Sequence, residues 1–190
     1  MKKWNGKNAL RILLYLALYM AGTAITCFTG AIHPIVFVCY QITAGILLSG
    51  IVIKGFDQIK APGVAAVFAA GVILIFVAIG DASAWHCIPL VVIAVIAELL
   101  RAAFGYTWAG DVIATAIMTF STFGFYGQIW FNRAFTYEAA IEEMPAGYAD
   151  TLMAYSPSWA LPVVIIIGIV FSVLVSNATA KLFKIEKTKG

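Results

Sequence analysis

The sequence predicts an all-α integral membrane protein, a six-transmembrane-helix bundle with a helical external lid between helices 5 and 6. Of its 190 residues, 63% are hydrophobic and 11% are charged, too little charge to cover a soluble domain of this length. Six stretches match the roughly 20 apolar residues that a helix needs to cross the hydrocarbon. None alternates polar and apolar residues as the strands of an outer-membrane barrel do.

The six expected spans form one transmembrane domain, with short connections except after helix 5. They cover roughly residues 9–28, 34–53, 62–80, 86–104, 109–131 and 159–183. Pro34 and Pro62 suit the first turns of helices 2 and 3, because the amide hydrogen that proline lacks has no helical partner there. Asp81 or Ser83 can cap helix 4.

The first span is expected to be a retained helix. Lys2 and Lys3 before an apolar run fit a signal peptide, and Cys27 fits a lipoprotein site. Thr26, however, is too large for the small residue that precedes a modified cysteine, and no Ala-x-Ala cleavage site follows. We therefore expect this helix to stay in the plasma membrane.

The basic residues predict the orientation. With both termini cytoplasmic, the inner side carries Lys2, Lys3, Lys7, Arg11, Lys54, Lys60, Arg101, Lys181, Lys184, Lys187 and Lys189. The outer side carries Arg133 alone. This positive-inside bias supports an even number of spans. It also accounts for the net charge of +3 without a nucleic-acid partner.

The long connection after helix 5, about residues 132–158, predicts the external lid. A stripe at helical spacing is expected to carry helix 5 past the membrane: Tyr126, Trp130, Arg133 and Tyr137. Pro145 and Gly147 break this helix, and a second stripe follows: Tyr148, Leu152 and Tyr155. The rings would face the bundle and Glu138, Glu142 and Glu143 would face water. An interfacial aromatic belt without a ligand is the alternative.

The sequence predicts no enzyme activity and no intrinsic cofactor. Gly50 and Gly55 have the spacing of a phosphate loop, but Phe56 stands where the lysine must be. Glu98 and Arg101, one helical turn apart, are expected to form an interfacial ion pair. No acidic residue lies in the middle of an expected span, which weighs against a carrier driven by an ion gradient.

The two histidines are candidate ligands of a metal or of haem iron. His33 and His86 both fall in expected external loops, and Cys27 and Cys87 lie near them in the sequence. Histidine is the commonest protein ligand of metals and can hold haem iron axially. The alternative is two loop histidines with ordinary hydrogen bonds. The two cysteines could pair with each other or pack as apolar side chains.

Several features together resemble an S component, the substrate-binding membrane subunit of an energy-coupling-factor (ECF) transporter. They are the basic N-terminus, the six spans, the absence of an ATP site and the pattern Ala17-x-x-x-Ala21, which also suits internal helix packing. More narrowly, "WFNRAFTYEA" and "GYADTLMAYSPSWALP" resemble the MptD-type group of S components, with Ser156 and Ser158 replacing two threonines of its pattern. The motif evidence lies between residues 130 and 162.

The resemblance implies a subunit that captures a vitamin-like or micronutrient compound at the outer face. It would pass the compound inward together with a transmembrane coupling protein and two ATPase subunits, which use ATP. The resemblance also implies that Ala17 and Ala21 contact the coupling protein. The ligand would lie under the external loops, so the expected lid would form part of its pocket.

Rings and hydrogen-bond donors near the expected outer face are the candidate substrate-binding residues. Flat walls can come from Trp85, Tyr126, Trp130 and Trp159. Asn132 and Arg133 can donate hydrogen bonds, and Arg133 suits a carboxylate or phosphate. A structural ion pair of Arg133 with Glu138 or Asp150 is the alternative.

The substrate stays open at this level. Two histidines, many rings and one arginine favour haem, a related tetrapyrrole or a metal chelate, and a flat aromatic vitamin would use the rings without the histidines. Two other function classes also stay open. They are a secondary transporter and a non-transport membrane protein, such as an assembly factor or a receptor subunit.

Overall fold

The computed structural model describes residues 4–187, and this part of the chain forms helices and connections without a strand. The expected all-α fold class is confirmed. The elements in chain order are α1 (Gly6–Gly30), α2 (Pro34–Val38), α3 (Tyr40–Leu47), α4 (Ser49–Gln58), α5 (Val64–Ile79), α6 (Ala84–Ala103), α7 (Trp108–Met118), the 3-10 helix η1 (Thr119–Thr122), α8 (Phe123–Tyr126), α9 (Gln128–Phe131), α10 (Arg133–Glu143), α11 (Tyr148–Tyr155) and α12 (Ala160–Leu182).

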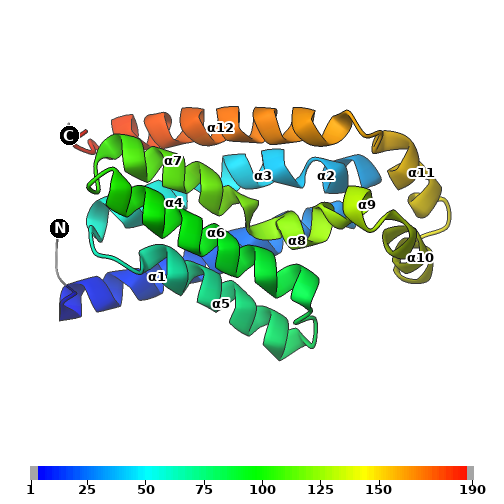
Figure 1. The fold of residues 1–190 in the computed structure, drawn as a ribbon, viewed down its shortest axis with the longest axis horizontal. Helices are drawn as coiled ribbons and strands as arrows, with labels where there is room; N and C mark the ends of the chain where they lie inside the picture. The colour runs from blue at the N-terminus through cyan, green and yellow to red at the C-terminus, as the bar shows by residue number, and fades with distance from the viewer. Residues whose placement is uncertain (1–3, 188–190) are drawn as a thin grey trace.

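The helices form an elongated bundle with two distinct ends (Figure 1). One end, which we call the terminal end, holds the start of α1, the end of α12 and the connections from α4 to α5 and from α6 to α7. The opposite end, which we call the distal end, holds α2, α10, α11 and the connection from α5 to α6. The start of the first helix and the end of the last helix therefore lie at the same end of the bundle.

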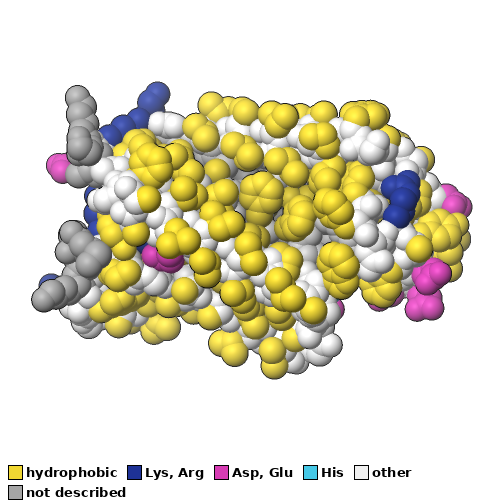
Figure 2. Space-filling view, in the orientation of Figure 1, with side chains coloured by type: hydrophobic (Ala, Val, Ile, Leu, Met, Phe, Trp, Pro, Cys, Tyr) yellow, Lys and Arg dark blue, Asp and Glu magenta, His cyan; other side chains and the backbone are white. Residues whose placement is uncertain are grey.

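The side surface of the bundle is that of a membrane protein. Helices α1, α6 and α12 are each long and apolar enough to cross a membrane, and α5 is a shorter apolar helix. Large apolar side chains point outward from them, for example Leu14, Leu99 and Ile166, each more than half exposed. Figure 2 shows hydrophobic side chains along one face, with charged groups toward the two ends. Such a surface suits hydrocarbon and not water.

Two of the expected spans are not continuous helices. Residues 34–53 form α2, α3 and part of α4, and residues 109–131 form α7, η1, α8 and α9. Where α7 ends, the Tyr19 hydroxyl donates to the Met118 carbonyl oxygen at 2.8 Å. A helix can be interrupted in a membrane only if the released backbone groups find partners inside the protein, and Tyr19 supplies one.

The expected continuous stripe from helix 5 into the lid segment is wrong. The chain leaves the helical conformation at Asn132 (φ −137°, ψ 52°), and α10 begins as a separate helix. The Asn132 carbonyl oxygen accepts from both the backbone amide and the hydroxyl of Thr136. Asparagine readily leaves helical conformations because its side chain competes for backbone hydrogen bonds.

Helices α3 and α12 pack with their backbones nearly in contact. A Cβ atom on Gly45 would lie 2.4 Å from the Gly168 carbonyl oxygen, and one on Gly168 would lie 2.6 Å from the Gln41 carbonyl oxygen. Only glycine fits at both positions. Gln41, which lies on α3 with Gly45, is fully buried, and its Nε2 donates to Thr119 Oγ1 at 3.0 Å. The short helices thus lock to α12 on one side and to η1 on the other.

A buried charge cluster holds the terminal end together. The expected pair of Glu98 and Arg101 is present, with 3.5 Å between Oε1 and Nη1. It is not the interfacial pair that the sequence suggested, because Arg101 is fully buried. Its Nε donates to Asp111 Oδ1 at 2.9 Å, and its guanidinium lies 4.0 Å from the Phe56 ring centroid. The turn between α6 and α7 brings Asp111 beside Arg101, which sequence spacing alone did not indicate.

The two ends of the bundle carry opposite charge. Among the described residues, the basic side chains of the terminal end are Lys7, Arg11, Lys54, Lys60, Arg101, Lys181, Lys184 and Lys187. The acidic side chains of the distal end are Asp81, Glu138, Glu142, Glu143 and Asp150, with Arg133 as the basic residue there. Lys2, Lys3 and Lys189 lie outside the described residues.

Candidate ligand-binding cavity

A cavity of about 750 Å³ lies at the distal end of the bundle. Side chains from α1, α2, α3, α5, α6, α8, α9, α10 and α11 line it. Pockets that bind small molecules have volumes of about 300–1,000 Å³ and mostly apolar walls with a few polar groups. The size and composition of this cavity match that description.

One wall of the cavity is a cluster of three rings. The His86 ring stacks on Phe125 with 3.9 Å between centroids and 18° between planes, and Phe76 meets Phe125 edge-on at 5.3 Å. Gly124 makes this contact possible, because a Cβ atom there would lie 2.4 Å from the Trp85 carbonyl oxygen. The glycine therefore lets α8 pack directly against the first turn of α6.

Hydrogen bonds fix the orientation of His86. The Ser83 hydroxyl caps α6 by accepting from the His86 amide at 3.2 Å, as the sequence suggested. The Nδ1 atom lies 2.9 Å from the Asp81 carbonyl oxygen and 3.2 Å from Asp81 Oδ1. A carbonyl oxygen only accepts, so Nδ1 carries the hydrogen, and Nε2 accepts from the Gln128 amide at 3.3 Å.

The polar part of the cavity is acidic and rich in acceptor oxygens. Asp81 and Glu143 line it, and none of the lysines and arginines of residues 4–187 does. Two other lining residues, Thr23 and Gln128, each have a buried oxygen without a hydrogen-bond partner among the described residues. An unpaired buried polar atom costs about 1–3 kcal/mol. A ligand that supplies hydrogen-bond donors would relieve that cost.

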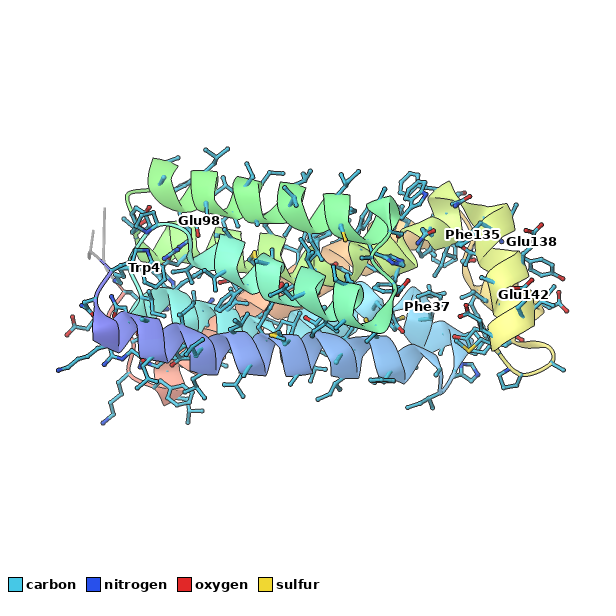
Figure 3. The ribbon with its side chains drawn as sticks, turned by 90° about the horizontal axis from the view of Figure 1, so that it is seen from below. Trp4, Phe37, Glu98, Phe135, Glu138 and Glu142 are labelled. Carbon is cyan, nitrogen blue, oxygen red and sulfur yellow. The ribbon has the colours of Figure 1, made fainter. Side chains whose placement is uncertain are left out.

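Helices α10 and α11 cover the cavity at the distal end. The expected break between them is present: Pro145 follows α10, and Gly147 has φ +83° before α11. Thr136 is buried against the cavity. Figure 3 shows Phe135 on the side of α10 toward the bundle and Glu142 on the side away from it. The inner side of α10 is therefore mostly apolar, with Glu143 of its last turn also lining the cavity, and Glu142 faces outward.

Two tyrosine hydroxyls bind the end of α1: Tyr148 of α11, which attaches this cover, and Tyr40 of α3, which belongs to the cavity wall. The Tyr148 hydroxyl donates to the Gly30 carbonyl oxygen at 2.5 Å, and the Tyr40 hydroxyl donates to the Cys27 carbonyl oxygen. The last carbonyl groups of a helix lack partners within the helix, so these hydroxyls complete α1. Partial burial raises the pKa of Tyr148 to about 12, which keeps this hydroxyl a donor at neutral pH.

Arg133 has a structural role that neither sequence interpretation anticipated. Its guanidinium donates to the Met153 carbonyl oxygen at 2.8 Å and to the Ser156 carbonyl oxygen and hydroxyl at 3.0 and 3.1 Å. Those groups lie where α11 ends, so Arg133 caps that helix. The ion pair expected with Glu138 or Asp150 is absent from the described residues, and Arg133 does not line the cavity.

Of the eight residues predicted to bind substrate, His86 alone lines the cavity. Tyr126 is fully buried and donates to Gln41 Oε1 at 2.8 Å, and Trp130 Nε1 donates to the Pro157 carbonyl oxygen at 3.0 Å. Asn132 forms the break before α10. Trp85 and Trp159 are exposed side chains, 49% and 66%, outside the cavity lining. The positions of these rings near expected span ends predict contact with a ligand. In the structure, the rings instead pack inside the bundle or lie on its outer surface.

The structure does not bring the two histidines together. His33 caps α2, with its Nδ1 accepting from the Ile35 amide at 3.2 Å, and it does not line the cavity. Among the described residues, no three His, Cys, Asp or Glu side chains form a metal-binding group. Cys27, Cys39 and Cys87 are all free, so the pair considered for Cys27 and Cys87 is not formed.

Sequence reasoning missed most residues of the cavity. Phe76 and Phe125 lie inside expected spans, where they look like ordinary lipid-facing or core side chains. Thr23 and Gln128 are polar residues within expected spans, and such positions are a recognised sign of a functional interior. The sequence therefore contains a signal for these two positions of the cavity.

The two alanines expected to contact a partner are on the surface. Ala17 and Ala21 are exposed on α1, on the same face as Leu14, Leu18 and Ile25. They are not used for packing within the bundle, which was the alternative for this pattern. We call the face made by these five residues the α1 stripe.

The comparisons with known proteins identify a family and no individual relative. A model of a bacterial protein family, described as hypothetical bacterial integral membrane protein (Trep_Strep), matches residues 6–186. The search of curated proteins and the search of solved structures each gave no significant match. The family description agrees with the apolar surface of the bundle.

Proposed function

The chain belongs to the Trep_Strep family of bacterial integral membrane proteins, and we propose that it is the substrate-binding S component of an ECF-type importer. In this proposal it captures a small micronutrient at the outer face of the plasma membrane. A transmembrane coupling protein and two ATPase subunits then drive uptake with ATP. The observation that carries the proposal is the cavity of about 750 Å³ at the distal end, lined on one side by α10 and α11.

The proposal places six crossings in the membrane, with both termini in the cytoplasm. The three long apolar helices and α5 supply four of them, and the interrupted runs α2–α4 and α7–α9 supply the other two. The basic terminal end then faces the cytoplasm and the acidic distal end faces outward, which satisfies the positive-inside rule. With this orientation α10 and α11 form an external lid over the cavity.

The α1 stripe is the proposed contact with the coupling protein. Small side chains let another helix approach closely in a membrane, where packing and not the hydrophobic effect drives association. Ala17 and Ala21 leave such a gap between larger apolar neighbours on an exposed helix face. None of the five stripe residues lines the ligand cavity, so the proposal allows both to be occupied at once.

The proposed substrate is a flat ring compound and not haem held between two histidines. His33 is outside the cavity, so a second axial ligand for haem iron is missing there. The two carboxylates of haem would also meet Asp81 and Glu143. The flat aromatic vitamin considered from the sequence agrees better with the ring cluster of Phe76, Phe125 and His86.

Affinity purification from native membranes followed by mass spectrometry tests the function. The tagged chain should retain a coupling membrane protein and two ATPases, and Ala17→Trp with Ala21→Trp should reduce their yield at least fivefold. Ile166→Trp, on an exposed position of α12, is the matched control and should leave the yield unchanged. Recovery of the unmodified chain without any ATPase would contradict the proposal.

A further inference from the structure

We infer that the cavity selects a ring compound that carries positive charge or several N–H donors, and that it rejects carboxylates and phosphates of the same size. This inference names the substrate class of the proposed function and rests on it. Three independent features of the cavity support it: the sign of its charged groups, its unpaired acceptor oxygens and the faces of its rings.

The charged side chains of the cavity are all acidic. Asp81 enters from the connection between α5 and α6, and Glu143 enters from the last turn of α10, so the two carboxyl groups come from different walls. Arg133, the basic residue of the distal end, caps α11, so among the described residues no lysine or arginine balances them; His86 contacts Asp81 through Nδ1 and leaves Glu143 without a basic neighbour in the lining. Asp81 is partly buried and Glu143 is exposed, so a ligand in the cavity can reach both carboxylates, and charges of one sign favour a ligand of the opposite sign.

The neutral polar groups of the cavity also call for donors on the ligand. Among the described residues Gln128 Oε1 has no hydrogen-bond partner, while Gln128 Nε2 donates to the Gly124 carbonyl oxygen at 2.6 Å and lies 3.3 Å from His86 Nε2. Thr23 Oγ1 also has no partner in this part of the chain, and this hydroxyl can accept a hydrogen bond from a ligand or donate one to it. Each oxygen is buried, so it gains from a small side-chain rotation toward a ligand N–H.

The rings of the cavity suit a flat cation. Phe76 and Phe125 lie on one wall, and Phe37 and Tyr40 come from α2 and α3 with 4.8 Å between their centroids. The faces of aromatic rings attract cations, most strongly where water is excluded.

Two quinolines with the same ring and opposite charge provide the test. 4-Aminoquinoline is a cation at pH 7 and quinoline-4-carboxylate is an anion. Equilibrium dialysis of the full-length protein in nanodiscs should give 4-aminoquinoline at least tenfold tighter binding. To locate the site, N-ethylmaleimide modification of Cys27, which lines the cavity, is measured in a Cys39→Ser, Cys87→Ser background. The cation should slow this modification.

Isosteric variants separate the cavity acids from the surface acids. Asp81→Asn with Glu143→Gln should reduce the preference for the cation to less than threefold. Glu138→Gln with Glu142→Gln is the matched control, since both residues are exposed on α10, and should retain most of the preference. A fluorescence melting curve for each variant shows that it is folded.

Three results would overturn the inference: equal or tighter binding of the carboxylate, binding of neither compound at millimolar concentration, or an unchanged preference in the cavity variant. These results leave the proposed function untouched, because copurification with ATPases does not depend on ligand charge. If the ATPases do not copurify but the preference for the cation remains, the transport function is contradicted and the inferred selectivity still holds.

Discussion

The Tyr148 hydroxyl lies 2.5 Å from the carbonyl oxygen of Gly30, a residue 118 positions earlier in the chain. This hydrogen bond joins α11 to the last residue of α1 and therefore sets the position of the cover over the cavity. Gly30 also lies against the Tyr40 ring, where a Cβ atom would meet the ring carbons at 2.7 Å and 2.9 Å. The end of α1 is thus the point where cover and cavity wall meet.

Removing this hydrogen bond should loosen the cover. Tyr148→Phe deletes the donor and leaves the ring, so the free energy of unfolding should fall by about 1 kcal/mol, the net value of one hydrogen bond. Hydrogen exchange in α10 and α11 should become faster, and Cys27 should react faster with maleimide. Tyr155→Phe is the control, because that half-exposed ring lies on the same helix without a described hydroxyl bond. Equal exchange in both variants would show that the Tyr148 bond does not hold the cover.

The same bond predicts a dependence on alkaline pH. Partial burial raises the pKa of Tyr148 from 10.0 to about 12, so the folded protein keeps this proton more strongly than the unfolded chain. The stability from the neutral hydroxyl is fully present below pH 10 and is lost as the pH rises from 10 to 12. The pKa of Tyr137 is also raised, by its hydrogen bond to Asp150, so this second tyrosine could contribute to the same pH dependence. The Tyr137→Phe variant removes that contribution.

Exchange of α11 measured from pH 9 to 12 checks this expectation. Protection of α11 should decline above pH 10 in the unmodified protein and in Tyr137→Phe, and the decline should be much smaller in Tyr148→Phe. A decline that begins below pH 9, or one of equal size in Tyr148→Phe, would assign the effect to another group.

A methyl group at Gly124 should damage the cavity. Gly124→Ala places a Cβ atom 2.4 Å from the Trp85 carbonyl oxygen, so α8 must move away from α6 and the stacking of His86 on Phe125 must weaken. Binding of 4-aminoquinoline should weaken at least tenfold, as measured by dialysis. Gly6→Ala is the control, because a Cβ atom there meets nothing within 4 Å. Unchanged binding in Gly124→Ala would show that the ring cluster is not part of the binding site.

Breaking the buried ion pair should destabilise the whole bundle without a specific effect on the cavity. Arg101→Met leaves Asp111 buried and without its closest partner, which typically costs about 3–5 kcal/mol. The double variant Arg101→Met, Asp111→Leu should recover part of this loss, because no unpaired charge remains. Thermal unfolding in nanodiscs measures both. If the double variant is less stable than the single one, the expected recovery is wrong, and the two side chains stabilise the bundle in a way that does not depend on avoiding an unpaired charge.

The general architecture could be predicted from the sequence, because the length of each apolar run indicates whether a helix can cross a membrane. Runs such as 163–170 exclude a soluble fold, and the expected helical break at Pro145 and Gly147 is present in the structure. These features follow from local chemistry, which a single sequence records.

The cavity could not be predicted, because it depends on contacts between distant residues. Arg133 looked like a ligand-binding donor, but its hydrogen bonds reach Met153 and Ser156 on a helix whose packing the sequence does not specify. Tyr126 looked like a pocket wall because it lies at an expected helix end, yet η1 and α8 turn it into the core beside Gln41. Helix interruptions such as these change which side chains face inward.

Labelling from one side of the membrane tests the central claim, that the end with the cavity faces outward. Glu142→Cys places a thiol on the exposed side of α10, and Lys184→Cys places one at the terminal end. In intact cells of a cysteine-free background, a membrane-impermeant maleimide should modify the thiol at position 142 and spare the one at 184 until the cells are lysed. Modification of position 184 with protection of position 142 would reverse the orientation and contradict capture of a substrate from outside.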